Sequence, residues 1–318
     1  MRVCRYRRDG VIHAGFYYDS FLVPVSEAAA QFSQAAKGLD SKACNDPLAL
    51  AGPGAAANAA HELAAQLDAD SAAREALAIL VEDVELLAPV AAPPKIILLA
   101  GNYASHIEEE GQIAVERAET FPYLFSKPNT TLNNPNADIP IPRVSPDHID
   151  YECELGVVIG RRVKHAEEAN ALDYVAGYTV VNDISDRKYR PNPERRPRER
   201  DAFHDWLAGK WHDGSCPVGP CLRSARSLPD PHTLRITTHV NGEPRQDATT
   251  AQMIFPAAAI VAFITRAITL EPGDIIATGT PAGVGATTGS FLKEGDRVDA
   301  AIEGIGVLSN TMTRESDT

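Results

Sequence analysis

A proline-rich connector at residues 88–94 divides this chain of 318 residues into two parts of different character. Pro89, Pro93 and Pro94 fix the backbone dihedral φ, so the segment is a stiff link between elements rather than an element itself. The length is sufficient for two domains. We therefore expect a small N-terminal domain over residues 1–92 and a larger domain over residues 93–318.

Short strands followed by alanine-rich helices are predicted for the first part. Asp9-Gly10 and Asp19-Ser20 interrupt β-rich runs in the manner of hairpin turns. The expected elements are strands over residues 3–6, 12–17 and 21–25 and helices over residues 61–67 and 72–81.

Strands dominate the predicted second part, with few helices between them. The polar tract of residues 183–213 gives no clear signal for an element. The expected elements are strands over residues 95–100, 149–159, 174–182, 234–240, 274–277 and 297–302 and helices over residues 103–110 and 256–268. The fold class predicted for the chain is therefore α/β of the α+β kind, dominated by strands.

Composition excludes several classes of protein. Asp and Glu outnumber Lys and Arg by 43 to 30, which gives a formal charge of -13 and argues against nucleic-acid binding. No apolar run is long enough to span a membrane, and no secretory signal is recognisable. Five cysteines without a Cys-x-x-Cys pair disfavour disulfide frameworks and zinc sites. We expect a cytoplasmic protein with reduced thiols.

Two glutamates and one aspartate could together hold a metal ion. Within residues 149–159, Glu152 and Glu154 stand two apart, so on a strand both would point to one face with Cα atoms about 7 Å apart. Asp183 follows the predicted strand 174–182 and would add a third carboxylate. Such an all-oxygen set suits Mg²⁺, Mn²⁺ or Ca²⁺ rather than zinc. The alternative is that the glutamates line a solvated sheet face and that Asp183 is an ordinary turn residue.

Six blocks, in the same order along about residues 95–310, make the sequence similar to the fumarylacetoacetate hydrolase family. The blocks are Gly101-Asn102-Tyr103-x-x-His106-x-x-Glu109, Asp150-Tyr151-Glu152-x-Glu154-Leu155, Asn182-Asp183-x-Ser185-x-Arg187, Gly209-Lys210, Cys216-Pro217-x-Gly219-Pro220 and Thr278-Gly279-Thr280-Pro281-x-Gly283-Val284-Gly285. The resemblance implies a mixed β-sandwich roll with a smaller N-terminal domain. It also implies a homodimer and a small-molecule keto-acid substrate.

The resemblance also assigns a metal site and a catalytic pair. It places Glu152, Glu154 and Asp183 at the family's metal-ligand positions, with Mg²⁺ as the first candidate ion and Mn²⁺ or Ca²⁺ as alternatives. It places His106 and Glu109 at a His–Glu dyad on a lid segment. Independently of the family, residues three apart share one face of a helix, and a carboxylate on one imidazole nitrogen leaves the other free to take a proton.

Further residues are assigned to charge stabilisation and substrate binding by the same resemblance. Lys210 and Arg187 match positions that stabilise developing negative charge. Thr280, next to Gly279 in a glycine-rich turn, matches a contact to the substrate carboxylate. Lys127 matches a residue that lines the pocket.

The sequence departs from the family pattern between residues 187 and 213. Arg190 stands where hydrolytic relatives often carry a glutamine, and we include it among the predicted substrate-binding residues. Seven basic residues lie within 14 positions: Arg187, Lys188, Arg190, Arg195, Arg196, Arg198 and Arg200. This tract is either an arm that collects a second substrate carboxylate or polar tail, or a solvated loop balanced by Glu194 and Glu199.

Three functions remain open at this point. The first is metal-dependent hydrolysis of a C–C bond in a 2,4-dioxo acid of the acylpyruvate type. The second is lyase or isomerase chemistry on the same metal-enolate site, such as oxaloacetate decarboxylation, dehydration of a sugar-derived keto acid, keto–enol isomerisation or isomerisation of a 2-hydroxy-dienoate. The third is a keto-acid binder without turnover, which the presence of His106, Glu109 and Lys210 disfavours.

Overall fold

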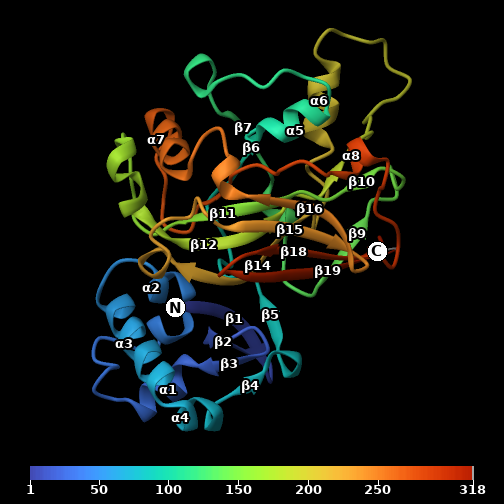
Figure 1. Cartoon of the computed structure of the whole chain (residues 1–318). Coiled ribbons are helices and arrows are strands. Elements are labelled where there is room, and N and C mark those ends of the chain that lie inside the picture. The colour runs from blue at the N-terminus through green and yellow to red at the C-terminus, as the bar shows by residue number, and fades with distance from the viewer. Residues whose placement is uncertain (317–318) are drawn as a thin grey trace.

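A twelve-stranded sheet extends through both parts of the chain in the computed structural model (Figure 1). The structure describes residues 1–316, and residues 317–318 lie outside it. The main path of the twelve-stranded sheet has the strand order β4-β3-β2-β1-β14-β12-β11-β17-β6-β7. A second sheet of five strands has the order β16-β15-β18-β19-β9. The predicted strand-dominated mixed fold is confirmed.

The first part of the chain contains five strands and four α-helices within the described residues. They are β1 (Arg2–Arg8), β2 (Val11–Tyr17), β3 (Phe21–Pro24), α1 (Val25–Gln31), α2 (Pro47–Ala51), α3 (Ala55–Ala69), α4 (Ser71–Ala76), β4 (Ile79–Leu80) and β5 (Glu85–Leu87).

The second part supplies the remaining elements. They are β6 (Ile96–Ala100), α5 (Ala104–Glu109), β7 (Tyr123–Ser126), β8 (Leu132–Asn133), β9 (Asp138–Ile141), β10 (Ile149–Asp150), β11 (Cys153–Ile159), β12 (Val175–Asn182), β13 (Ser185–Asp186), α6 (Asp201–Ala208), β14 (Cys216–Ser224), β15 (Arg235–Val240), β16 (Glu243–Thr249), α7 (Ala257–Ala267), β17 (Ile275–Ala277), α8 (Gly285–Thr288), β18 (Arg297–Ile302) and β19 (Gly306–Arg314). Among residues 1–316, no helix has both the length and the apolar character that a membrane span requires. All five cysteines are free and buried.

Two apolar layers lie on opposite faces of the large sheet. One layer joins β11 and β12 to the five-stranded sheet and to α7, through residues such as Leu155, Ile260 and Leu308. The other joins the opposite face of the same strands to the N-terminal helices, through residues such as Val181 and Leu63. The central strands are therefore buried on both sides, which explains their nearly continuous apolar sequences.

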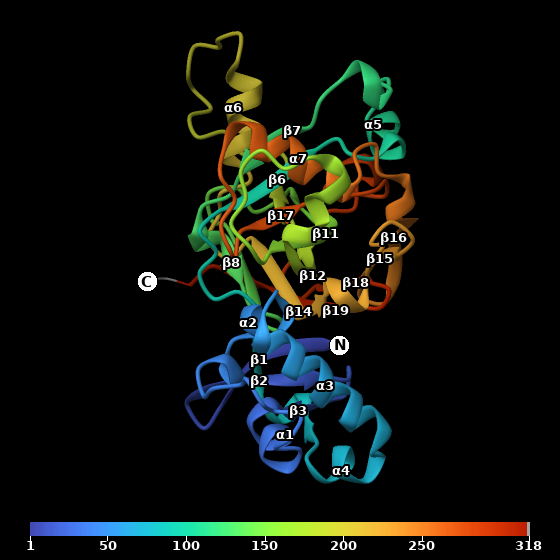
Figure 2. The same cartoon turned by 90° about the vertical axis from the view of Figure 1, so that its left-hand side faces the viewer.

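The two parts of the chain share this sheet, because β1 pairs with β14 through Arg2–Arg223 and Val3–Leu222. Figures 1 and 2 show the N-terminal strands and helices at one end of the molecule and α5 and α6 at the opposite end. A division into domains at residue 92 stays a prediction.

The strand predicted over residues 149–159 is interrupted at Tyr151 and Glu152. The Asp150 carboxylate accepts a hydrogen bond from the N–H of Tyr151, and the side chain of Asn182 accepts one from the N–H of Glu152. These side-chain bonds replace the strand ladder for two residues. As a result Glu152 lies immediately before β11 rather than within it.

Two predictions for helices were wrong. The helix predicted over residues 72–81 ends at Ala76, because Ile79 and Leu80 form β4 and pair with β3. The polar tract of residues 183–213 contains helix α6, for which we predicted no element. Arg195 pairs with Asp201 and Asp205 of α6, and these contacts depend on the folded loop before the helix.

We predict that His61 makes the stability of the protein pH-dependent. His61 on α3 contacts Ser224 on β14, with 3.0 Å between Nε2 and Oγ. Burial, and after it the positive charges of Arg226, the N-terminus and Arg223, lower the pKa of His61 from 6.5 to about 4. The unfolded chain therefore takes up a proton near pH 6.5 that the folded chain refuses until about pH 4. The contribution of His61 to the free energy of unfolding is therefore fully present above pH 6.5 and is lost as the pH falls towards 4.

Urea unfolding at several pH values tests this contribution. Because the ring is partly exposed, we expect the free energy of unfolding to fall by about 1 kcal/mol more in the wild type than in His61→Asn between neutral pH and about pH 5. Equal pH dependence of the two proteins would contradict the prediction.

Candidate metal centre and His–Glu dyad

The ends of two paired central strands bring three carboxylates together. Glu152 precedes β11, Glu154 lies within it, and Asp183 follows β12. Because Cys153 pairs with Asn182, the start of β11 lies beside the end of β12. One carboxylate oxygen of each acid lies within 4.8 Å of the others, and all three side chains are buried.

Three buried or nearly buried cations surround two of these acids. Lys210 Nζ lies 2.9 Å from Glu152 Oε2 and 2.6 Å from Asp183 Oδ2. Lys127 Nζ lies 2.7 Å from Asp183 Oδ1, and Arg187 Nη2 lies 2.6 Å from Glu152 Oε1. Burial opposes ionisation of Glu152, but Lys210, Arg187 and His106 outweigh it and lower its pKa to about 2. Glu152 is therefore held as a carboxylate.

Glu154 is the acid that no cation contacts. Its Oε2 accepts a hydrogen bond of 2.6 Å from the N–H of Gly279, but its buried Oε1 has no hydrogen-bond partner among the described residues. Burial, and after it the charges of Asp183 and Glu152, raise the pKa of Glu154 well above its usual value. A buried acceptor without a donor is costly, and a cation at this point would remove the cost. The chemistry of the site therefore fits a divalent cation that prefers oxygen ligands.

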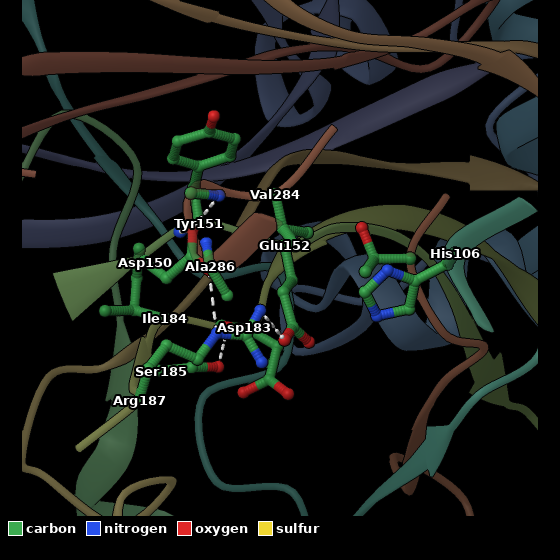
Figure 3. A network of polar contacts seen from close by, with 12 residues as sticks. His106, Asp150, Tyr151, Glu152, Asp183, Ile184, Ser185, Arg187, Val284 and Ala286 are labelled. Atoms are coloured by element: carbon green, nitrogen blue, oxygen red, sulfur yellow. Dashed lines mark hydrogen bonds and ion pairs between the residues drawn. The ribbon is translucent and has the colours of Figure 1, made fainter. Parts of the chain in front are cut away.

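His106 and Glu109 form a dyad on helix α5. His106 Nδ1 lies 2.7 Å from Glu109 Oε1, and Glu109 Oε2 accepts hydrogen bonds from the N–H of Gly283 at 2.8 Å and the hydroxyl of Thr287 at 3.1 Å. The other ring nitrogen, Nε2, has no hydrogen bond within residues 1–316. It forms only a long ion-pair contact of 3.8 Å with Glu110 Oε1. Figure 3 shows the ring directed towards Glu152 and Asp183. Glu109 thus fixes the ring and leaves Nε2 available on the side of the acidic cluster.

Asp150 supports the site, although it is not among the site residues predicted from the sequence. Its buried carboxylate accepts hydrogen bonds from Arg187 Nε at 2.7 Å and from the N–H groups of Gly285 at 2.6 Å and Ala286 at 2.9 Å (Figure 3). Asp150 therefore holds Arg187 against Glu152 and joins it to the glycine-rich turn. Its place in the motif Asp150-Tyr151-Glu152 is the signal that could have identified it.

Gln246 and Asn102 hold the loops around the site. Gln246 Nε2 donates to Thr280 Oγ1 and to the carbonyl of Pro281, both at 2.8 Å, and Gln246 Oε1 accepts from the N–H of Cys153 at 3.2 Å. Asn102 Nδ2 donates to the carbonyl of Thr278 at 2.8 Å. Asn102 lies in a family block, but nothing in the sequence around Gln246 marks it.

The predicted substrate-binding residues occupy different environments. The Thr280 hydroxyl donates to the carbonyl of Cys153 at 2.9 Å, so its proton is already used within the protein. Gly279 has φ of 90°, and a Cβ there would lie 2.9 Å from Asn102 Cβ, so the close approach requires glycine. Arg190 is exposed and makes no hydrogen bond or ion pair with the described residues. The structure thus brings Gly279, Thr280 and Lys127 to the acidic cluster, but not Arg190.

We predict opposite effects of Glu154→Gln in the absence and presence of metal. Without metal, replacing an acid that is buried among acids should raise the free energy of unfolding by about 1 kcal/mol. A Mg²⁺ concentration of about one hundred times Kd should stabilise the wild type by about 2.7 kcal/mol, and the variant by less than half of that amount. Thermal unfolding in EDTA and in Mg²⁺ measures both effects, with Glu108→Gln, an exposed acid on α5, as the control. An undiminished Mg²⁺ effect in Glu154→Gln would contradict the assignment.

Comparisons with known proteins identify the family to which the chain belongs. The sequence model of the family described as Fumarylacetoacetate (FAA) hydrolase C-terminal matches residues 95–313. The mitochondrial oxaloacetate tautomerase Fahd2a of Rattus norvegicus is 38% identical over 247 residues, which are 76% of this chain and 74% of that protein.

Solved structures resemble the whole chain, including the N-terminal part. The fumarylacetoacetate hydrolase of Exiguobacterium antarcticum has a TM-score of 0.73 at 29% identity, with 99% of this chain and 100% of that chain covered. The 2-hydroxyhepta-2,4-diene-1,7-dioate isomerase of Mycobacterium marinum has a TM-score of 0.65 at 29% identity, with 100% of both chains covered. The names of these relatives include a hydrolase, an isomerase and a tautomerase. The chain belongs to the fumarylacetoacetate hydrolase family.

Proposed function

We propose that this protein catalyses the keto–enol tautomerisation of a 2-keto acid, with oxaloacetate as the first substrate to test. The observation that carries the proposal is the His106–Glu109 dyad, whose free nitrogen faces a buried cluster of acids and cations. One base beside a site that stabilises an enolate is sufficient for tautomerisation. The name of the rat relative supports the choice of substrate.

His106 is the proposed base. From enol to ketone, the enol hydroxyl would lose its proton to solvent and the protonated Nε2 would deliver one to the carbon next to the 2-oxo group. In the reverse direction Nε2 would take that proton from the carbon, and solvent would protonate the enolate oxygen. Glu109 accepts a hydrogen bond from Nδ1–H, so it selects the tautomer and stabilises the imidazolium that forms. The bonds from Gly283 and Thr287 keep Glu109 in place for this task.

The acidic triad and its cations would stabilise the enolate. Glu152, Glu154 and Asp183 would hold Mg²⁺, or Mn²⁺ or Ca²⁺ in its place, and the bound ion would supply positive charge for an enolate oxygen. Lys210 and Arg187 supply fixed positive charge at the same point, because each contacts Glu152. Lys127 keeps Asp183 oriented.

Hydrolysis of an acylpyruvate is the second candidate. The same dyad could take a proton from water, and a structural relative is named fumarylacetoacetate hydrolase. Hydrolysis also requires a donor for the oxyanion of the attacked carbonyl. Arg190 replaces the glutamine of hydrolytic relatives at that position, and it is exposed. We therefore rank tautomerisation first.

We predict that His106→Asn slows the conversion of enol to keto oxaloacetate by about a hundredfold or more. Glu109→Gln should slow it by about tenfold or more, because the ring loses the carboxylate that stabilises its charge. The loss of the ultraviolet absorbance of the enol measures the rate. Glu108→Gln is the matched control on the same helix and should keep the wild-type rate. EDTA should abolish most of the activity of the wild type. Wild-type turnover in His106→Asn would contradict the role of the base.

Identification of the products separates the candidate reactions. With oxaloacetate we expect the keto form without release of CO₂, and with an acylpyruvate we expect no free pyruvate. Release of pyruvate and the free acid from acylpyruvate, abolished by EDTA, would replace tautomerisation with hydrolysis. Release of pyruvate and CO₂ from oxaloacetate would replace it with decarboxylation.

A further inference from the structure

Two short segments carry the cations that contact Glu152, and they touch each other at one junction. Arg187, which follows β13, lies 2.6 Å from Glu152 Oε1, and Lys210, which follows α6, lies 2.9 Å from Glu152 Oε2. The N–H of Asp186 donates a hydrogen bond of 2.9 Å to the carbonyl of Gly209. A Cβ on Gly209 would lie 2.2 Å from the carbonyl oxygen of Asp186, so the two backbones are in direct contact. The position of one cation relative to the other is therefore set at this junction.

A side-chain contact crosses the same junction on the side away from the acidic cluster. Consecutive side chains of an extended segment point to opposite sides, so Asp186 points away from the acids that Arg187 contacts. His212 meets Asp186 there, with 3.4 Å between Nε2 and Oδ2. Both atoms are buried, and neither has a hydrogen-bond partner among residues 1–316. The ring of His212 also packs edge-on against Tyr189, with 5.0 Å between the ring centroids.

Asp186 depends on His212 for its charge balance. The carboxylate of Asp186 is fully buried, and its Oδ1 accepts only the N–H of Lys188, at 3.1 Å. Within the described part of the chain, His212 is the one basic side chain that forms an ion pair with Asp186. A buried carboxylate that loses its partner is strongly destabilised. The contact with His212 is therefore what keeps Asp186 directed into the protein.

We propose that His212 and Asp186 are positioning residues: their contact fixes Lys210 and Arg187 relative to each other and so sets how strongly the site stabilises an enolate. The inference rests on the proposed function only for the need to stabilise an enolate, which hydrolysis and decarboxylation share. Without the contact, Asp186 would turn towards water and draw along the backbone that bonds to Gly209. A displacement of about 1 Å in a catalytic group can cost about a hundredfold in rate, so a smaller shift here has a measurable effect.

Binding of stable analogues measures this effect without turnover. Oxalate carries a negatively charged oxygen where an enolate would carry one, whereas pyruvate has a neutral 2-oxo group at that point. Isothermal titration of the Mg²⁺-loaded full chain measures the Kd of each, and their ratio reports the stabilisation of the additional charge. We expect the wild type to bind oxalate at least about tenfold more tightly than pyruvate. Partial unfolding weakens both ligands equally, so a purely structural defect leaves the ratio unchanged.

Variants at His212 separate its contact with Asp186 from its packing. His212→Phe keeps a ring against Tyr189 but removes the partner of Asp186, and should lower the ratio by about fivefold or more. The amide of His212→Gln can donate to Asp186, so this variant should keep the ratio within about twofold of the wild type. His204→Gln replaces an exposed histidine on α6 and is the matched control.

Asp186→Asn tests the pair from its other side, and it removes the buried charge that could make His212→Phe unstable. It should lower the ratio by about threefold or more. The double variant Asp186→Asn/His212→Phe should lower the ratio no further than the larger of the two single losses, because residues in contact act as one unit.

The outcomes separate the pair from the reaction. A wild-type preference for oxalate that persists in both His212→Phe and Asp186→Asn would overturn the positioning role and leave the proposed function standing. Losses that multiply in the double variant would also overturn it, because the two residues would then act independently. A wild type without preference for oxalate would overturn the pair and the enolate site together. A preference that falls in the single variants supports the pair even if oxaloacetate is not a substrate, in which case only the proposed reaction fails.

Discussion

The burial of three convergent carboxylates, joined through Arg187 to a fourth at Asp150, is the constraint on which the rest of this structure depends. Asp150, Glu152 and Asp183 each contact at least one of three cations, whereas Glu154 receives only a backbone N–H. An isolated buried charge costs several kcal/mol. Three cations for four acids therefore leave one negative charge uncompensated. A divalent cation would compensate the remaining negative charge and give Glu154 a partner, and this connects the fold to the proposed chemistry.

The surrounding elements keep this cluster in place. The pairing of β11 with β12 brings the three acids together, and Asp150 and Gln246 of β16 both bond to the loop that follows β17. Glu109 joins α5 to the same glycine-rich turn through Gly283. The base, the acids and the turn are therefore one connected network.

The sequence predicted the parts of the site that depend on local pattern. The spacing of Glu152 and Glu154 and the position of Asp183 at a strand end indicated a metal site, and the spacing of His106 and Glu109 indicated a helical pair. It did not reveal Gln246, whose contacts join residues distant along the chain. The break in the strand at Tyr151 and the formation of α6 depend on side-chain bonds that exist only in the folded protein. The homodimer and the cytoplasmic location stay predictions.

Anomalous diffraction from crystals of the protein grown with Mn²⁺ tests the central claim most directly. We predict one strong anomalous peak per chain within coordination distance of Glu152, Glu154 and Asp183, with Glu154 Oε1 among the ligand atoms. The peak should be absent in crystals of Glu154→Gln grown under the same conditions. A wild-type map with no peak at this cluster, or with its only peak elsewhere, would contradict the assignment of the metal centre and with it the proposed enolate chemistry.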